Sequence, residues 1–446
     1  MGDTVTLVAI SNGELSWPPS TVSPPGTPPP VPSAFPQPPI NPSLSMSDRA
    51  TVVVLGGGVG GVVAARSLRK KLPEQHRVVI VDRQRDHLFA PSLLWLMTGK
   101  RTPGAISRPL DRLARRGIEV IEGEISQIDP DTRRVRVVEH PDGGDPLSRR
   151  LGGVGRDLEA DHLIVSLGVD LAPETIPGLA EAGHNFYTLA GAESLRHALG
   201  GFNGGRIVVL TATPAYKCPA APYEAAMLLL DDCRRRGIGD STQVDLYAAE
   251  PSPMGVTGPD VSAQVRRMVE DQGITYHPEH QVTEVDGSAK TLAFANGATA
   301  GFDLLAYVPL HRAPQVIRDA GMVDDSGWVP VDRHTLHTRF PAVYAIGDVT
   351  GIPLTMGKPL PMAGVFAERQ AEVVANNIAY TITGKGEPAS FDGYGECFIE
   401  TGAGKAGFGA GDFYAEPVPQ ITLHRPSRRW HLGKLLFEQN WLRRRI

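Results

Sequence analysis

The side chains of this chain best suited to redox chemistry are its three cysteines. Cys218 stands in the segment Tyr-Lys-Cys-Pro-Ala-Ala-Pro, and Cys397 ends the segment Phe-Asp-Gly-Tyr-Gly-Glu-Cys. Three cysteines among 446 residues cannot form a disulfide framework and are typical of a reducing compartment. Any pairing among them is therefore expected to be catalytic rather than structural. Free cysteines are often simply small buried hydrophobes, and we expect this of Cys233, which lies on a predicted helix.

A β-α-β unit is predicted near the start of the chain, where it would position a nucleotide. Apolar strands are expected at 51–55 and 77–81, with a helix at 62–72 between them. The sequence G-x-G-x-x-G joins the first strand to the helix, and an acid follows the second strand. This order of elements is the dinucleotide-binding fingerprint, whose helix N-terminus offers free N–H groups to a pyrophosphate.

Each residue of the fingerprint has a physical role. Gly56 permits the tight turn, Gly58 lets the backbone approach a pyrophosphate, and Gly61 lets the helix pack closely on the strand. Asp82 can accept hydrogen bonds from a ribose diol. The whole unit in register predicts dinucleotide binding, whereas a lone glycine motif would also fit a merely tight turn.

Two later segments resemble motifs of the flavoproteins that contain two dinucleotide-binding domains. The strand at 162–168 ends in Gly168, as in the crossing motif of that group. Another strand ends in Gly347 and Asp348, as in the second flavin motif, and a helix is predicted at 363–380. The resemblance implies that the cofactor is FAD, with the aspartate on the ribityl chain and the helix N-terminus facing the isoalloxazine ring.

A second β-α-β unit is predicted from the strand at 205–210, the helix at 223–235 and the strand at 244–249. The turn at 211–222 contains no glycine and three prolines, which lack the N–H donors that a phosphate cradle uses. We therefore expect a Rossmann-like domain that has lost its fingerprint and binds no nicotinamide nucleotide. Glu250, which follows the last strand, is interpreted as structural.

From Thr51 to its C-terminus, the chain resembles the sulfide:quinone oxidoreductase family. The matching elements are the glycine fingerprint, Phe89-Ala90-Pro91, Lys217-Cys218-x-x-Ala221-Pro222, Gly347-Asp348 and Asp392-Gly393-Tyr394-x-x-Cys397. Some members of the family place the second cysteine directly after the Gly-Asp strand, but the corresponding segment here, 349–351, contains none.

The resemblance implies FAD-dependent oxidation of sulfide to sulfane sulfur or polysulfide, with electrons passed from the flavin to a quinone. It implies that Cys218 and Cys397 act as a pair and that Glu224 accepts a proton, the alternative being a solvated glutamate in a first helical turn. It also implies that Lys358 stabilises the reduced flavin, the alternative being a surface lysine. His311 is a weaker candidate for proton relay.

Other functions remain open at this stage. A related flavoprotein could use another sulfur donor, or a soluble acceptor such as cytochrome c. A protein that binds FAD for interaction or regulation, without turnover, is a further alternative, because one fold hosts many activities. The net charge of −5 gives no reason to expect nucleic acid, and no metal site is expected.

A quinone acceptor requires contact with a membrane, and residues 425–446 are the candidate for it. They combine seven Lys and Arg residues with one acid and several Trp, Phe and Leu residues. We expect their leucines to pack on the protein and their aromatic residues to face lipid or flavin, the alternative being a terminal helix docked on its own domain. No segment is apolar enough to span a membrane. The expected location is cytoplasmic, peripheral on the inner face of the membrane.

The predicted fold is α/β, with two Rossmann-like domains and a short C-terminal extension. Residues 17–42 hold twelve prolines and no charge, which is typical of a flexible tail. Met46, just before the first strand, is an alternative start, and whether the chain forms a homo-oligomer is left open. The predicted segments are the tail 1–48, the FAD domain 49–170 and 316–385, the second domain 171–315 and the extension 386–446.

Overall fold

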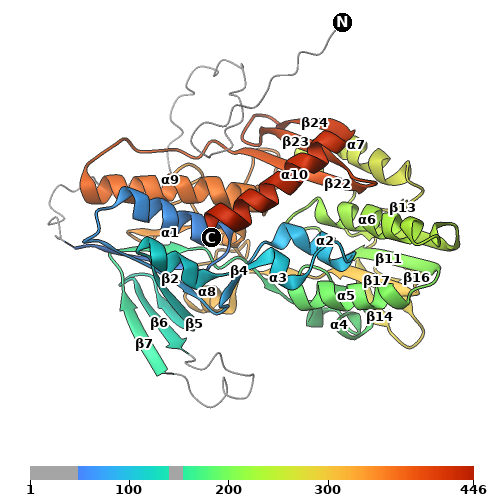
Figure 1. Cartoon of the computed structure of the whole chain (residues 1–446), viewed down its shortest axis with the longest axis horizontal. Helices are drawn as coiled ribbons and strands as arrows, with labels where there is room; N and C mark the ends of the chain where they lie inside the picture. Colours follow the sequence, from blue (N-terminus) through green and yellow to red (C-terminus); the bar gives the residue numbers. More distant parts are fainter. Residues whose placement is uncertain (1–48, 140–153) are drawn as a thin grey trace, which may run out of the picture. The chain divides into compact units, whose positions relative to one another are not determined.

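The computed structural model describes residues 49–139 and 154–446, so the predicted tail at 1–48 lies outside the described residues. The chain forms two sheets with Rossmann-like β-α-β connections, which confirms the predicted fold class (Figure 1). The first sheet has the order β20-β8-β1-β2-β5-β6-β7 and is parallel from β20 to β5. Its strands are β1 (Thr51–Leu55), β2 (Arg77–Asp82), β5 (Glu119–Asp129), β6 (Arg134–Glu139), β7 (Val154–Glu159), β8 (His162–Val165) and β20 (Val343–Ala345).

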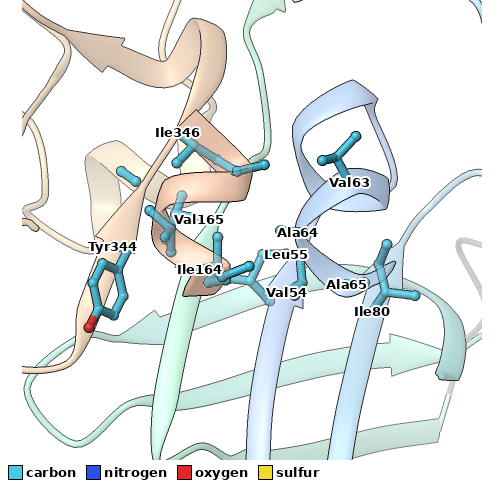
Figure 2. Close-up of a cluster of buried hydrophobic side chains, with 14 of the residues drawn as sticks. Val54, Leu55, Val63, Ala64, Ala65, Ile80, Ile164, Val165, Tyr344 and Ile346 are labelled. Atoms are coloured by element: carbon cyan, nitrogen blue, oxygen red, sulfur yellow. The ribbon is translucent and has the colours of Figure 1, made fainter. Parts of the chain in front are cut away.

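The centre of this sheet is fully buried because its strands are continuous apolar runs. Helices α1 (Val59–Lys71) and α9 (Gly364–Thr383) pack against each other beside it. Figure 2 shows Val54 and Leu55 of β1 clustered with residues of α1, β2 and β8, and with Tyr344 and Ile346 from the β20 region. The small residues Ala64 and Ala65 of α1, both without solvent exposure, let the helix lie close to the strands.

The second sheet is wholly parallel, in the order β10-β17-β11-β12-β13. Its strands are β10 (His184–Asn185), β11 (Gly205–Thr211), β12 (Thr242–Ala248), β13 (Thr275–His277) and β17 (Leu304–Val308), and its longer helices are α5 (Leu189–Gly201), α6 (Ala221–Arg235) and α7 (Pro259–Glu270). A small antiparallel sheet accompanies it, formed by β14 (Val282–Asp286), β15 (Thr291–Phe294) and β16 (Thr299–Gly301).

One segment of the first half contributes to the core of the second. Helix α2 (Leu93–Met97) and Ile106, at the end of α3 (Pro103–Ile106), are buried among residues of α5 and α6. The predicted domain boundaries therefore stay predictions, with this crossover as an addition that the sequence did not indicate.

The C-terminal part forms an antiparallel sheet and a helix. It contains β22 (Tyr394–Gly402), β23 (Lys405–Asp412), β24 (Gln420–Ser427), α10 (Arg428–Asn440) and the π-helical turn η8 (Trp441–Arg445). Strand β22 contacts both α6 of the second half and α9 of the first, and α10 lies on β23 (Figure 1). Within 49–139 and 154–446, no helix has the length and apolar character needed to cross a membrane.

Candidate active site

The glycine turn after β1 is built so tightly that only glycine fits two of its positions. Gly56 has a φ of +100°, and a Cβ there would lie 2.2 Å from the Ser166 carbonyl oxygen. A Cβ on Gly61 would lie 1.8 Å from the Gly56 carbonyl oxygen. A Cβ on Gly58, which caps α1, would meet no atom within 4 Å. The turn therefore packs closely on its inner side and offers an approachable backbone at the helix N-terminus, which fits a pyrophosphate.

Asp82 lies beside this turn at the end of β2. Its carboxylate accepts hydrogen bonds from the backbone N–H of Gly57, at 2.5 Å, and of Gln84, at 2.6 Å. Burial raises the pKa of Asp82 despite these two donors. The aspartate therefore fixes the shape of the glycine turn, and it stands where a ribose diol would meet it in the dinucleotide fold.

The remaining residues predicted to bind the cofactor lie at neighbouring strand ends. Gly168 follows β8 with a φ of +65° and open space around a built Cβ. Gly347 follows β20, and its N–H donates to the side chain of Gln370 in α9 at 2.7 Å. Burial raises the pKa of Asp348, and the ammonium of Lys217 opposes that rise. The residues at the ends of β1, β8 and β20 thus fit one extended dinucleotide.

Cys218 lies in the loop between β11 and α6, and this loop reaches across to the first half. The Cys218 N–H donates to the carbonyl oxygen of Met362, two residues before α9, at 2.6 Å. Its carbonyl accepts from the Ala221 N–H, at 2.9 Å, and from the Tyr187 hydroxyl, at 3.2 Å. Cys218 adopts a φ of +50°, which is uncommon for a side-chain-bearing residue. These bonds hold the cysteine near the N-terminus of α9.

Cys397 lies in β22, opposite Gly409 of β23, and its thiol donates to the Phe398 carbonyl at 3.3 Å. Both cysteines are half-buried and carry free thiols. Burial raises the pKa of Cys397 to about 12, and it raises that of Cys218 as well, with the Cys397 thiolate as the next largest cause. The charge of Cys397 thus acts on the thiol of Cys218. Cys233 is fully buried in α6, as a structural cysteine would be.

Glu224 lies in the first turn of α6 and is buried rather than solvated, with 2% of its surface exposed. Its Oε1 accepts from the Glu400 backbone N–H and from Lys434 Nζ, each at 2.8 Å. Burial raises the pKa of Glu224, although the Lys434 ammonium opposes it. The Glu224 carboxylate in turn raises the pKa of both Cys218 and Cys397. The predicted proton acceptor is thus an electrostatic neighbour of both thiols.

Helix α10 buries two of its charged residues, Lys434 and Glu438, against the protein. Lys434 binds Glu224, and Glu438 forms an ion pair with Arg101 at 2.6 Å. Leu432 and Leu436 are 55% and 45% exposed. The expectation that the leucines pack on the protein is therefore wrong for these two, whereas Leu435 packs against the core of the second half and Leu442 is 4% exposed. That the aromatic residues face lipid or flavin stays a prediction.

The end of the chain is hydrogen-bonded to the glycine turn. Trp441, 2% exposed, donates from Nε1 to His87 Nε2 at 2.9 Å. Because that nitrogen accepts, His87 carries its proton on Nδ1 and donates it to the Gly57 carbonyl at 2.8 Å. The π-helical turn η8 thereby supports the loop that approaches the dinucleotide.

In the second half, Glu250 stands where a nucleotide-binding acid would be expected, and its carboxylate is hydrogen-bonded by side chains of the protein. Glu250 is buried and accepts hydrogen bonds from the hydroxyls of Thr211 at 2.8 Å, Tyr216 at 2.5 Å and Tyr223 at 2.7 Å. Tyr216 is two residues before Cys218. Glu250 therefore anchors the cysteine loop, as its structural interpretation implies.

Two candidates lie apart from the buried acid groups. Lys358 is exposed, and its Nζ lies close to Gly255, since a Cβ built on that glycine would be 2.4 Å from it. The role of Lys358 toward a flavin stays a prediction. His311 is buried, and its Nδ1 donates to the Pro309 carbonyl oxygen at 2.8 Å. Burial lowers its pKa to about 4. Its ring packs edge-on against Tyr187, whose hydroxyl binds the carbonyl of Cys218.

Sequence reasoning missed three charged residues of the site: Lys434, Glu400 and His431. His431 and Lys434 are three residues apart on α10 and therefore share one face of it. A search for charged residues at helical spacing in 425–446, rather than for an apolar stripe, would have selected them. Glu400 lies in a strand whose sequence carried no such signal.

Comparisons with known proteins agree with this geometry. The family model described as pyridine nucleotide-disulphide oxidoreductase matches residues 50–371. A mitochondrial sulfide:quinone oxidoreductase of Mus musculus is 24% identical over 85% of this chain and 81% of its own length. A sulfide-quinone reductase of Aquifex aeolicus is 28% identical over 88% of this chain and 90% of its own.

The solved structures include the sulfide:quinone oxidoreductase of Aquifex aeolicus, which superposes with a TM-score of 0.76 at 24% identity. The superposition covers 88% of this chain and 90% of that one. At this identity the likeness shows a shared fold.

Proposed function

Because the chain belongs to the pyridine nucleotide-disulphide oxidoreductase family and is a flavin oxidoreductase similar to sulfide:quinone oxidoreductases, we propose that it oxidises sulfide and reduces a quinone. The observation that carries this proposal is the position of Cys218. Its N–H donates to the carbonyl oxygen of Met362, two residues before α9, and the charges of Cys397 and Glu224 raise the pKa of its thiol. A redox sulfur held near the N-terminus of the helix that follows the second flavin motif supports the proposal.

The residues fit FAD as the cofactor. Gly56, Gly58 and Gly61 would hold the pyrophosphate, Asp82 the adenosine ribose, and Asp348 the ribityl chain. When bound, FAD accepts two electrons from sulfur and passes them to the quinone. The chain's own part is to bind and orient the cofactor, to hold the cysteines and to move protons.

The sulfur chemistry is assigned to the two cysteines in their oxidised, disulfide form. Sulfide attacks one sulfur; a new S–S bond forms as the Cys218–Cys397 bond breaks, which leaves one persulfide and one thiolate. A nucleophilic sulfur acceptor then removes the outer sulfur of the persulfide. Re-forming the disulfide releases two electrons, which a bound flavin would take up. Hydrogen sulfide and an acceptor thiol thus give one persulfide, two electrons and two protons. Glu224, whose charge raises the pKa of the Cys397 thiol, would accept one of these protons.

Anaerobic absorbance spectroscopy of the purified protein tests this proposal. Sulfide is expected to bleach the flavin band, and a soluble quinone added afterwards is expected to restore it. Bleaching by sulfide that quinone does not reverse would instead favour a soluble acceptor such as cytochrome c. No bleaching would favour another sulfur donor or a protein that binds FAD without turnover.

The variant Cys218→Ser separates the cysteine from the cofactor. We expect it to retain FAD and to lose flavin reduction by sulfide by about a thousandfold or more, because the serine hydroxyl cannot form the persulfide. Cys233→Ser is the matched control and should behave as wild type. Undiminished bleaching in Cys218→Ser would sink the assignment of this cysteine.

A quinone acceptor further requires peripheral membrane contact, which we assign to the outer face of α10. Leu432 and Leu436 lie one helical turn apart, and both are exposed. The exposed arginines around them are Arg425, Arg428, Arg429, Arg443 and Arg444. Apolar side chains flanked by basic ones suit the surface of an anionic bilayer. This contact would place the protein at the inner face of a membrane, facing the cytoplasm.

Sedimentation with anionic vesicles tests the membrane assignment. The double change of Leu432 and Leu436 to Ser should abolish binding, whereas Val418→Ser, at another exposed apolar residue, should not. Equal sedimentation of the three proteins would contradict the assignment.

A further inference from the structure

A cavity of about 330 Å³, called here the arginine pocket, lies where the end of the chain passes α3. One wall is formed by the segment 101–108, which contains α3, and the other by the last residues of α10 and by η8. Figure 1 shows the C-terminal end of α10 beside α3. Small-molecule sites occupy about 300–1,000 Å³, so this volume admits a small group or one end of a larger molecule.

One of the three arginines that line the pocket is neutralised by a carboxylate. Arg101 donates to Glu438 from Nε at 2.9 Å and from Nη2 at 2.6 Å. The carboxylate of Glu438 also accepts from the Ser92 hydroxyl at 2.5 Å, and the Glu438 side chain is only 5% exposed. Glu438 is thus held by these two partners and is not available to a second arginine.

The other two arginines, Arg108 and Arg443, form no ion pair with any residue of 49–139 or 154–446. Arg108 Nη1 instead donates to three backbone carbonyl oxygens at 2.6 to 3.3 Å, those of Gly104, Ala105 and Ser107. Carbonyl oxygens carry no net charge, so these bonds fix the guanidinium without neutralising it. Arg443 is exposed, in η8. Three arginines and one carboxylate leave the pocket with a net charge of +2.

A phosphate ester is the kind of ligand that these walls fit. A guanidinium presents a planar fork of N–H donors that matches the oxygens of a phosphate. Nε and Nη2 of Arg108 form no hydrogen bond with a residue that the structure describes, so they are free to donate. Gln439 adds a carboxamide to the lining, and Leu442, 4% exposed, adds an apolar side chain. An apolar wall beside the charges favours an ester with carbon beyond its oxygens over a free inorganic ion.

The pocket continues the exposed apolar face of α10. Leu432, Leu436 and Gln439 are four and three residues apart, so they share one face of this helix. Gln439 lines the pocket, and Arg443 follows it in η8. With the two leucines in the acyl layer of a membrane, the pocket would therefore lie at the level of the headgroups.

We propose that the arginine pocket binds the phosphate of an anionic phospholipid whose acyl chains lie against Leu432 and Leu436. The inference rests on the proposed function in taking the outer face of α10 as the side that meets the membrane. It adds selectivity, because this face then recognises a phosphate as well as the negative charge of a bilayer. Arg108 and Arg443 bind the phosphate oxygens, while the ion pair of Arg101 with Glu438 holds the two walls together.

Isothermal titration calorimetry of the purified full chain with dihexanoyl phosphatidic acid, kept monomeric below its critical micelle concentration, tests the pocket without a membrane. We expect wild type to bind one lipid. Arg108→Gln and Arg443→Gln should each weaken binding about tenfold or more, because each removes a hydrogen bond to a charged group. Arg443 is exposed at the end of the chain, so its variant keeps the test valid if Arg108→Gln does not fold.

The matched control is Arg115→Gln, at an exposed arginine of the 3-10 helix η2 (Leu110–Arg116) that does not line the pocket. It removes the same charge and should leave the affinity for the lipid unchanged. Inorganic phosphate, titrated in the same way, distinguishes the two sources of the anion. We expect it to bind at least about tenfold more weakly than the lipid, because it lacks the carbon that would contact Leu442.

Binding of one lipid that both pocket variants weaken, with Arg115→Gln equal to wild type, would establish the site. No binding in wild type would overturn it, as would equal affinities in all four proteins. Inorganic phosphate that binds as tightly as the lipid would assign the pocket to a soluble anion and overturn the lipid as its ligand. The titration uses no sulfide, quinone or vesicles, so a failure of sulfide to bleach the flavin would refute the proposed function without changing this result.

Discussion

The two Rossmann-like halves have the same strand–helix–strand order and differ at the turn that follows the first strand. In the first half, three residues (56–58) connect β1 to α1. In the second half, nine residues (212–220) connect β11 to α6, and Cys218 lies among them. The short turn presents backbone N–H groups to a ligand, whereas the long one carries a side chain across to the other half. One topology thus supports a cofactor site in one copy and a redox residue in the other.

The acids that follow the second strand of each unit show the same contrast. Asp82 accepts hydrogen bonds from two backbone N–H groups of its own neighbourhood. Glu250 accepts from three hydroxyls, two of them on tyrosines whose pKa values burial raises. The carboxylate oxygens of Glu250, which would meet a nicotinamide ribose in a nucleotide-binding domain, therefore accept hydrogen bonds that hold the cysteine loop.

The largest effect is expected from a methyl group in the first turn. Gly61→Ala places a Cβ 1.8 Å from the Gly56 carbonyl oxygen, so the turn must open, and FAD binding should be lost. Gly200→Ala, at an exposed position of α5 with open space around it, is the control in the second half and should bind FAD normally. The flavin-to-protein absorbance ratio after purification measures both. Normal FAD content in Gly61→Ala would mean that the turn does not bind the cofactor.

A second change tests whether Glu250 holds the cysteine loop. Glu250→Ala leaves three hydroxyls without their acceptor, so we expect a loss of about 3 kcal/mol in the free energy of unfolding, with FAD retained. Because Tyr216 is two residues from Cys218, reduction of the flavin by sulfide should slow as well. Thermal melting and anaerobic stopped-flow absorbance measure the two effects. Glu193→Ala, at an exposed residue of α5, is the control, and unchanged reduction kinetics in Glu250→Ala would dissociate the tyrosine from the cysteine loop.

The parts of this fold that could be predicted from sequence are those fixed by local patterns. The strand Thr51–Leu55 was predicted at its observed bounds, because a continuous apolar run between a polar residue and a glycine admits few alternatives. The absence of a glycine fingerprint at 211–222 was equally readable, since prolines and bulky residues exclude a phosphate turn. In both cases the information lies within a dozen residues.

The buried ion pair of Glu224 and Lys434 could not be predicted in this way. Glu224 and Lys434 are separated by 210 residues, and only the folded chain brings them together. The outward face of α10 was mispredicted because burial was assigned to apolar residues, whereas Lys434 and Glu438 are buried by their partners. Strand β23, which holds three glycines among eight residues, has too little β-propensity to be recognised before its neighbours are known.

The smallest expected effect concerns the support that the C-terminus gives to the first turn. Trp441→Phe keeps the aromatic ring and removes the donor to His87, so that His87 is free to change tautomer and its bond to the Gly57 carbonyl weakens. One hydrogen bond contributes about 1 kcal/mol, so FAD should bind roughly fivefold more weakly. Recovery of free FAD fluorescence on dilution measures this, and Trp328→Phe, at a residue outside this contact, is the control. An unchanged FAD affinity in Trp441→Phe would show that the first turn holds its shape through Asp82 alone. The terminal helix would then serve only the cysteine pair, because the second half has no phosphate turn to support.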